Sequence, residues 1–275
     1  MSAPALPPLL APEEFVKHLH ADGVLVVDLS QGQVHRQAHV PGAVHVDFRL
    51  TQNGAMPAPG NLPSEAALSE LLSSIGLTPD THVVAYDDEG GGWAGRFLWL
   101  LAMVGHGKWS YLDGGIHAWL AAGLPIEQDL NEPAPSRYTA HITGAAGVDK
   151  HWLRDHLGDA DLAIWDARSA DEYHGVRALA ARGGHIPRAV NLDWIECMDR
   201  TRSLRLKNPE QLRATLAALG ITADKNIVTH CQTHHRSGLT WLAGTLLGFP
   251  RMRAYAGSWS EWGNDPSLPV ESPLK

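Results

Sequence analysis

The 275-residue chain repeats itself at a nearly constant distance, and this repeat limits the folds that it can adopt. The segment His-Val-Pro-Gly-Ala-Val at 39–44 returns as His-Ile-Pro-Arg-Ala-Val at 185–190, an offset of 185 − 39 = 146. Two further pairs of segments, 75–80 with 219–224 and 124–127 with 268–271, are each offset by 144. A long internal repeat of this kind indicates two copies of one domain.

The repeat and the composition together predict the domain boundaries. Residues 1–127 and 148–275 are expected to be the two domains, and the Pro-, Ala- and Gly-rich residues 128–147 are expected to link them. At roughly 150 residues per domain, the chain length is also that of about two domains.

Short apolar runs alternate with helical segments in each copy. The runs at 24–28 and 162–166 end in aspartate and are typical of buried parallel strands, as is the run at 227–230. One helix is predicted to begin after Asn208, with Pro209 first and Gln211 third as in a capping box, and to end at Gly220. An apolar helix is predicted over 239–247. This alternation predicts the α/β class, with a mainly parallel sheet and helices on both faces in each domain.

The composition excludes several classes of protein. The chain has 22 Lys and Arg against 30 Asp and Glu, a net charge of −8, which argues against a nucleic-acid partner. Its two cysteines are too few for a disulfide scaffold or a Cys-only metal cluster. The amino terminus lacks the charged region of a secretory signal, and the longest apolar run, 97–104, is too short to span a bilayer. We therefore expect a soluble, cytoplasmic protein without a membrane partner.

The two copies differ most in the loop after the third strand. The second copy has Cys231, then Gln232, Thr233, His234, His235, Arg236 and Ser237, before its apolar helix. In such a loop, backbone N–H groups and a helix N-terminus can surround a thiol, which lowers its pKa and leaves room for an anion. Arg236 would add a permanent cation suited to oxyanions, and the two histidines would add donors.

The first copy has Asp87 where the offset of 144 places Cys231. Asp88 and Glu89 follow, so three carboxylates and no nucleophile occupy this loop. We expect it to repel anions, and we interpret the first domain as structural or modulatory.

The combined motifs resemble those of the tandem-domain rhodaneses, the thiosulfate/3-mercaptopyruvate sulfurtransferase family. The matching pieces are the strand-end aspartates, both His-x-Pro-x-Ala segments, the Cys231 loop, and the stretch 257–262, Gly-Ser-Trp-Ser-Glu-Trp. The resemblance implies an inactive first domain and an active second one. It also implies a double displacement through a persulfide on Cys231, with residues 232–237 binding the anionic sulfur donor.

In that family the sulfur of thiosulfate passes to cyanide or to a thiol, without an organic cofactor or metal. The resemblance therefore implies thiosulfate or a similar small anion as donor. We expect a monomer.

Several alternatives stay open at this point. The donor could be 3-mercaptopyruvate, or the protein could be a persulfide carrier that delivers sulfur to a protein partner. A cysteine-dependent phosphatase or arsenate reductase is a weaker hypothesis, because Arg236 follows the cysteine by five positions and not by six. Cys197 is interpreted as structural, His39 and His185 as braces of their turns, and Asp28 and Asp166 as partners of local backbone or arginine.

Overall fold

The structure is a computed structural model that describes residues 6–272. The chain divides into two compact units. The first unit comprises the residues up to Thr51, Pro63–Thr143 and Asp199–Leu206; the second comprises Gln52–Leu62, Gly144–Met198 and the residues from Lys207 onward. Each unit therefore contains a short segment from the other half of the sequence. We call residues 52–62 the first arm and residues 199–206 the second arm.

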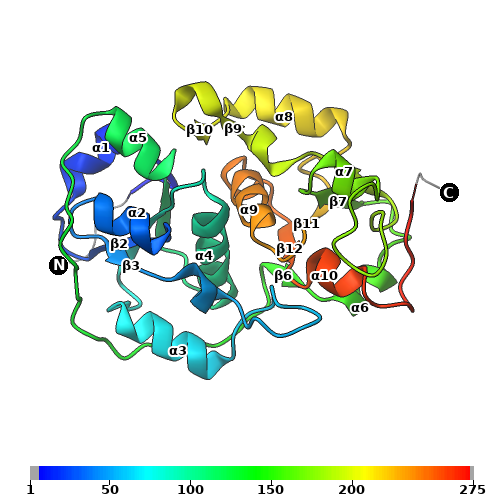
Figure 1. The fold of residues 1–275 in the computed structure, drawn as a ribbon, viewed down its shortest axis with the longest axis horizontal. Helices are drawn as coiled ribbons and strands as arrows, with labels where there is room; N and C mark the ends of the chain where they lie inside the picture. The colour runs from blue at the N-terminus through cyan, green and yellow to red at the C-terminus, as the bar shows by residue number, and fades with distance from the viewer. Residues whose placement is uncertain (1–5, 273–275) are drawn as a thin grey trace. The chain divides into compact units, whose positions relative to one another are not determined.

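Figure 1 shows the helices and strands of both units. Among residues 6–272, each unit contains one five-stranded sheet, and the two sheets have the same order. The order in the first unit is β1 (Leu9–Leu10), β5 (Trp109–Leu112), β4 (His82–Tyr86), β2 (Val24–Asp28) and β3 (Val44–His45). In the second unit it is β6 (Gly147–Val148), β12 (Met252–Tyr255), β11 (Asn226–His230), β7 (Leu162–Asp166) and β8 (Ala189–Asn191). All neighbouring strands in both sheets are parallel. The α/β class and the two-copy architecture are thus confirmed.

Helices connect the strands of both units. Those of the first unit are α1 (Pro12–Phe15), α2 (Gly32–Gln37), α3 (Glu65–Ser74), α4 (Gly92–Met103) and α5 (Gly115–Ala121). Those of the second are α6 (Lys150–Asp155), α7 (Ala170–Tyr173), α8 (Pro209–Ala218), α9 (Arg236–Leu246) and α10 (Ser258–Trp262). The 3-10 helices among the described residues are η1 (Val16–His18), η2 (Phe48–Thr51), η3 (Trp194–Cys197) and η4 (Arg200–Arg202). The short strand β9 (Met198–Asp199) pairs with β10 (Arg205–Leu206).

The central strands are covered on both faces. All five residues of β4 and the last four of β11 are buried, which requires packing on each side of the sheet. Each unit has its own apolar core: Phe15, Val84 and Trp119 pack together in the first, and Ile164, Val228 and Trp262 in the second. No helix among the described residues is long and apolar enough to cross a membrane.

The local predictions hold at most helix and strand ends. The runs 24–28 and 162–166 are β2 and β7, and α8 begins as predicted after Asn208, whose side chain accepts from the N–H groups of Glu210 and Gln211. Gly220 follows that helix with a φ of +77°, the left-handed conformation that ends many helices. One boundary was wrong: the apolar helix begins at Arg236 and not at 239, because its polar first turn continues directly from the Cys231 loop.

Two of the repeated segments pair with each other in each unit. His39 forms an antiparallel bridge with Glu127, and His185 forms the same bridge with Glu271. Each histidine also stacks on an aromatic ring at nearly the same distance, His39 on His35 at 3.9 Å and His185 on Tyr173 at 3.8 Å. These contacts confirm that the two histidines brace their turns.

Candidate active site

Cys231 lies directly after β11, at the carboxyl end of the second sheet, where parallel α/β sheets bind ligands. Its side chain is buried, with 1% of the residue exposed. The backbone around it is fixed from α10, because Trp259 N–H donates to the Cys231 carbonyl at 2.9 Å and Cys231 N–H donates to the Ser258 hydroxyl at 3.3 Å. The thiol therefore lies at the base of a rigid loop between strand β11 and helix α9.

The loop favours the thiolate form of Cys231. Burial alone would raise the thiol pKa, but the Arg236 charge, the Ser237 hydroxyl, and the Ser237 and Thr233 N–H groups outweigh it. The pKa of Cys231 is therefore lowered from its ordinary value. By contrast, burial raises the pKa of Cys197 far above the ordinary range, and the Lys207 charge does not offset it. The structure thus separates a thiol with a lowered pKa from one with a raised pKa.

Arg236 does not face the loop as an uncompensated cation. Its guanidinium forms a two-pronged ion pair with Glu172 of α7, at 2.6 Å and 2.8 Å. Burial would raise the pKa of Glu172, but the Arg236 hydrogen bonds outweigh it and hold that pKa below its ordinary value. The Arg236 charge, partly compensated by Glu172, and the Ser237 and Thr233 N–H groups together give the positive potential at Cys231.

Glu172 was not singled out from the sequence. It belongs to a capping box, since the Ser169 hydroxyl accepts from the Glu172 N–H and the Glu172 carboxylate accepts from the Ser169 N–H. The Ser169-x-x-Glu172 spacing was the available signal, and it is a signature of helix starts rather than of active sites. The contact with Arg236 joins residues 64 positions apart, which spacing does not reveal.

The other predicted loop residues point in different directions. His234 is fully buried with a φ of +57°, and its Nδ1 lies 2.7 Å from the Ser237 hydroxyl, so it positions that hydroxyl. Gln232 donates its side-chain amide to the Leu179 carbonyl at 3.0 Å. His235 lies against Trp194, with ring centroids 5.4 Å apart. Among the described residues, no three His, Cys, Asp or Glu side chains are placed to share a metal ion.

A buried charged network supports the strand end next to Cys231. Asp166 at the end of β7 accepts from Arg168 at 2.6 Å, and His230 Nε2 lies 3.6 Å from the same carboxylate. Burial lowers the pKa of His230. Burial would raise the pKa of Asp166, but the His230 and Arg168 charges outweigh it, so the pKa of Asp166 is lowered. The expectation that Asp166 pairs with an arginine is confirmed. Asp28, its counterpart in the first unit, instead bonds the Ser30 N–H at 2.8 Å and His35 at 2.7 Å.

The first arm packs directly on the Cys231 loop within the second unit. A Cβ atom added to Gly60 would lie 2.3 Å from the Thr233 carbonyl oxygen and 2.6 Å from that of Ala256, too close for any side chain. The Ser260 hydroxyl donates to the Pro57 carbonyl at 2.8 Å. The amino-terminal half of the sequence therefore supplies part of the support for the loop.

The corresponding loop of the first unit encloses a carboxylate. Asp87 is buried, and it accepts from four backbone N–H groups at 2.8–3.0 Å, those of Glu89, Gly91, Trp93 and Ala94. Burial, followed by the Glu89 charge, raises its pKa to about 6, so the group is ionised at neutral pH. The loop does not merely repel anions, as the sequence suggested: its own side chain fills the place an anion would take.

Comparison with known proteins agrees with this pair of units. The model of the rhodanese-like domain matches the chain twice, over residues 11–122 and 149–265. The chain belongs to the rhodanese family. Both units are therefore rhodanese domains by fold, and they differ in the residue at the base of the loop.

Curated rhodanese relatives match over nearly the whole length. The chain is 48% identical to a thiosulfate sulfurtransferase of Azotobacter vinelandii, over 97% of this chain and 98% of that protein. It is 45% identical to a thiosulfate sulfurtransferase of Pseudomonas aeruginosa, over 97% of both chains. A crystal structure of an anaerobic ergothioneine biosynthesis enzyme from Chlorobium limicola has the same fold. It has a TM-score of 0.87 and 22% identity, over 98% of this chain and 71% of that one.

Proposed function

We propose that the chain is a thiosulfate sulfurtransferase in which Cys231 is the nucleophile. The main support for the proposal is the lowered pKa of the buried Cys231 thiol, because the Arg236 charge and the hydrogen bonds of the loop favour its thiolate form. The two relatives of 45–48% identity named as thiosulfate sulfurtransferases support the same reaction. The two free cysteines fit a reducing, cytoplasmic location.

The proposed reaction has two displacement steps. The Cys231 thiolate attacks the outer sulfur of thiosulfate, the S–S bond of the donor breaks, and sulfite leaves with the bonding electron pair. Cyanide or a thiolate then attacks the terminal sulfur of the Cys231 persulfide, and the electron pair of that S–S bond returns to the thiolate. A covalent intermediate of this kind predicts ping-pong kinetics.

The chain's own residues have separate roles in these steps. The Thr233 and Ser237 N–H groups and the Ser237 hydroxyl stabilise negative charge on Cys231, first as thiolate and then as persulfide. His234 holds the Ser237 hydroxyl in place. Arg236 contributes its charge from a position fixed by Glu172, and the backbone of residues 232–237 encloses the proposed donor site.

Thiosulfate is favoured over 3-mercaptopyruvate as donor. Seven consecutive residues, 231–237, contain a cation and two histidines but no carboxylate, which suits a compact dianion. A probable 3-mercaptopyruvate sulfurtransferase of Pseudomonas aeruginosa is 34% identical to the chain, so that donor is the second candidate. A higher kcat/KM with 3-mercaptopyruvate than with thiosulfate would reverse the order.

A carrier function is the other candidate, because the chain is 30% identical to the sulfur carrier protein TtuD of Thermus thermophilus. Steady-state release of sulfite from thiosulfate in the presence of cyanide supports the enzyme. A single turnover that stops at the persulfide would support the carrier.

Intact mass measurement after thiosulfate treatment tests the nucleophile. We expect one added sulfur atom on the wild type, its removal by cyanide, and no addition to Cys231→Ala. Addition of sulfur to Cys231→Ala, or none to the wild type with either donor, would contradict the proposal. Hydrolysis of a phosphate ester that depends on Cys231 would favour the phosphatase hypothesis instead.

A further inference from the structure

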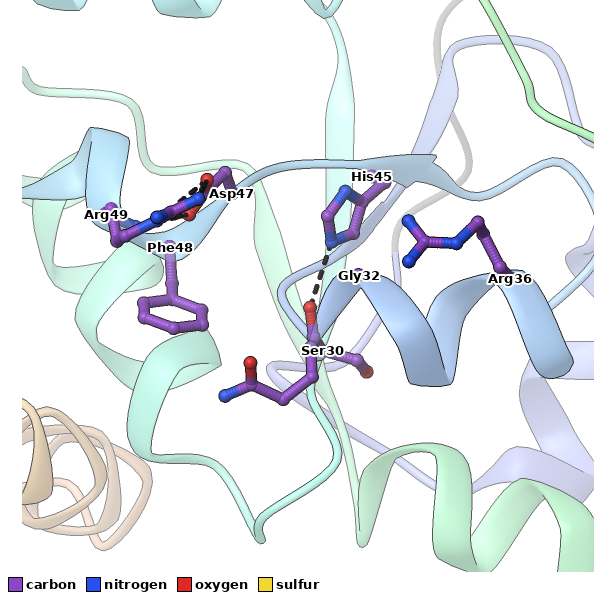
Figure 2. Close-up of a pocket in the computed structure, with 8 residues that line it drawn as sticks. Ser30, Gly32, Arg36, His45, Asp47, Phe48 and Arg49 are labelled. Carbon is purple, nitrogen blue, oxygen red and sulfur yellow. Dashed lines mark hydrogen bonds and ion pairs between the residues drawn. The ribbon is translucent and has the colours of Figure 1, made fainter.

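A cavity of about 390 Å³ lies in the first unit, away from the Cys231 loop in the sequence and on a different sheet. It is found where β2 and β3 end, at the carboxyl edge of the sheet. Ligands of parallel α/β sheets bind at this edge. Its lining, drawn in Figure 2, consists of Ser30, Gln31, Gly32, Arg36, His45, Asp47, Phe48 and Arg49.

The charged groups of this lining leave an excess of positive charge. Two arginines and one aspartate line the cavity, and Asp47 is engaged by Arg49 through two Nε contacts of 3.0 Å. Among residues 6–272 the structure gives Arg36 no carboxylate partner. In a chain of net charge −8, a cavity with an uncompensated guanidinium is a local exception that attracts anions.

His45 and Arg36 lie together on one wall of the cavity. In Figure 2 the Arg36 guanidinium points toward the His45 ring. Both lie over Gly32, whose added Cβ would be 3.4 Å from Arg36 Nη1 and 3.5 Å from His45 Cε1. A glycine at this position therefore makes room for the two side chains to lie close together.

The orientation of His45 is fixed before any ligand arrives. Its Nε2 lies 2.9 Å from the Ser30 carbonyl oxygen, which makes Nε2–H a donor to the backbone. Its ring also stacks on His35 at 4.8 Å, and His35 is held in turn by the buried Asp28 at 2.7 Å. The ring is therefore held in place as a fixed wall beside Arg36, and Arg36 supplies the N–H donors that face the cavity.

We propose that this cavity binds a small oxyanion of the sulfate class, with Arg36 as its principal ligand and His45 beside it. A guanidinium presents paired N–H donors that match two oxygens of such an anion. The exposed Arg49 adds a second guanidinium on the opposite wall, and its pairing with Asp47 limits the total charge that the cavity can hold. The site is independent of the proposed sulfur transfer, since none of its residues belongs to the Cys231 loop.

Inorganic sulfate is the probe, because it is an oxyanion of this class that carries no transferable sulfur. The wild-type protein, with labelled arginine and histidine side chains, is titrated with sodium sulfate against chloride at constant ionic strength. We expect saturable NMR shifts of the Arg36 and His45 side-chain signals in the millimolar range, Kd about 1–10 mM.

Three variants test the assignment. Arg36→Gln should weaken sulfate binding about tenfold, and Arg36→Lys should weaken it less, because it keeps the charge and loses the paired donors. Arg137→Gln is the matched control: it removes the same charge from an exposed arginine outside the cavity and should leave the Kd unchanged. Equal loss in Arg137→Gln, unchanged binding in Arg36→Gln, or shifts confined to residues 231–237 would each overturn the proposal.

Discussion

The loops after β4 and β11 have the same place in the same fold and enclose different groups. In the first, a buried carboxylate accepts four backbone N–H bonds. In the second, a buried thiol receives backbone N–H groups, a hydroxyl and the Arg236 charge. The shared feature is an amide-lined loop that stabilises a negative charge. The fold thus supplies the loop, and the side chains within it decide which negatively charged group the loop encloses.

Moving the thiol to the first loop gives the largest expected effect. In Asp87→Cys combined with Cys231→Ser, the new thiol would have backbone donors, but Gly92 stands where the second loop has Arg236. We expect sulfur transfer from thiosulfate to cyanide to stay on the order of 10²–10³-fold below wild type, because loss of one preorganised group that stabilises the reacting charge usually costs that much. Activity within tenfold of wild type would show that the amide loop alone is sufficient.

The two natural thiols, Cys231 and Cys197, are expected to differ in reactivity. Cys231 has a lowered pKa and Cys197 a raised one, so at neutral pH the thiolate fraction of Cys231 is far larger than that of Cys197. Iodoacetamide should therefore label Cys231 on the order of 10² times faster or more. The rate should fall only when the pH drops below the lowered pKa of Cys231, because protonation removes the nucleophile. Peptide mapping over a pH series measures the labelling rate of each cysteine and its pH dependence. Labelling of Cys197 at a rate comparable to that of Cys231 in the folded protein would contradict the proposed difference between the two thiols.

The first arm allows the support of the Cys231 loop to be tested with a matched pair of glycines. Gly60→Ala places a methyl group against the Thr233 and Ala256 carbonyls, and we expect it to reduce kcat/KM by about tenfold to a hundredfold, because small displacements of a reacting group are costly. It should also slow alkylation of Cys231 at neutral pH, which a change in stability alone would not do.

Gly54→Ala is the control within the same arm. Its φ of +68° strains an alanine, but nothing lies within 4 Å of the added Cβ. We expect a loss of stability of about 1 kcal/mol and little change in kcat/KM. If the two variants lose activity equally, the arm affects stability and does not position the loop.

The smallest expected effect concerns Glu172. In Glu172→Gln the Arg236 charge is no longer compensated, so the site attracts a dianion more strongly. We expect the KM for thiosulfate to fall about fivefold, equivalent to about 1 kcal/mol, with the first-displacement rate changing less. Rapid-mixing kinetics at two salt concentrations would separate the effects. A rise in KM would mean that Glu172 chiefly holds Arg236 in position.

Much of the architecture was predictable because short local patterns of residues determine where many strands and helices begin and end. Apolar runs ending in aspartate became β2 and β7 without a change of boundary, and the Asn208 cap began α8 as expected. The start of α9 was missed because Arg236, Ser237 and Gly238 are polar or small and look like loop residues, although Ser237 and Gly238 are buried in the helix. Periodicity identifies the apolar part of a helix better than its ends.

The repeat, the fold class and the choice of Cys231 over Cys197 could be predicted from the sequence, because they depend on residue type and spacing along one chain. The contacts of each side chain became known only from the folded structure. It paired Arg236 with Glu172 across 64 positions, placed four N–H groups on Asp87, and brought Gly60 onto the Cys231 loop. Such contacts join residues distant in sequence, and their energies depend on burial and direction, which spacing does not encode.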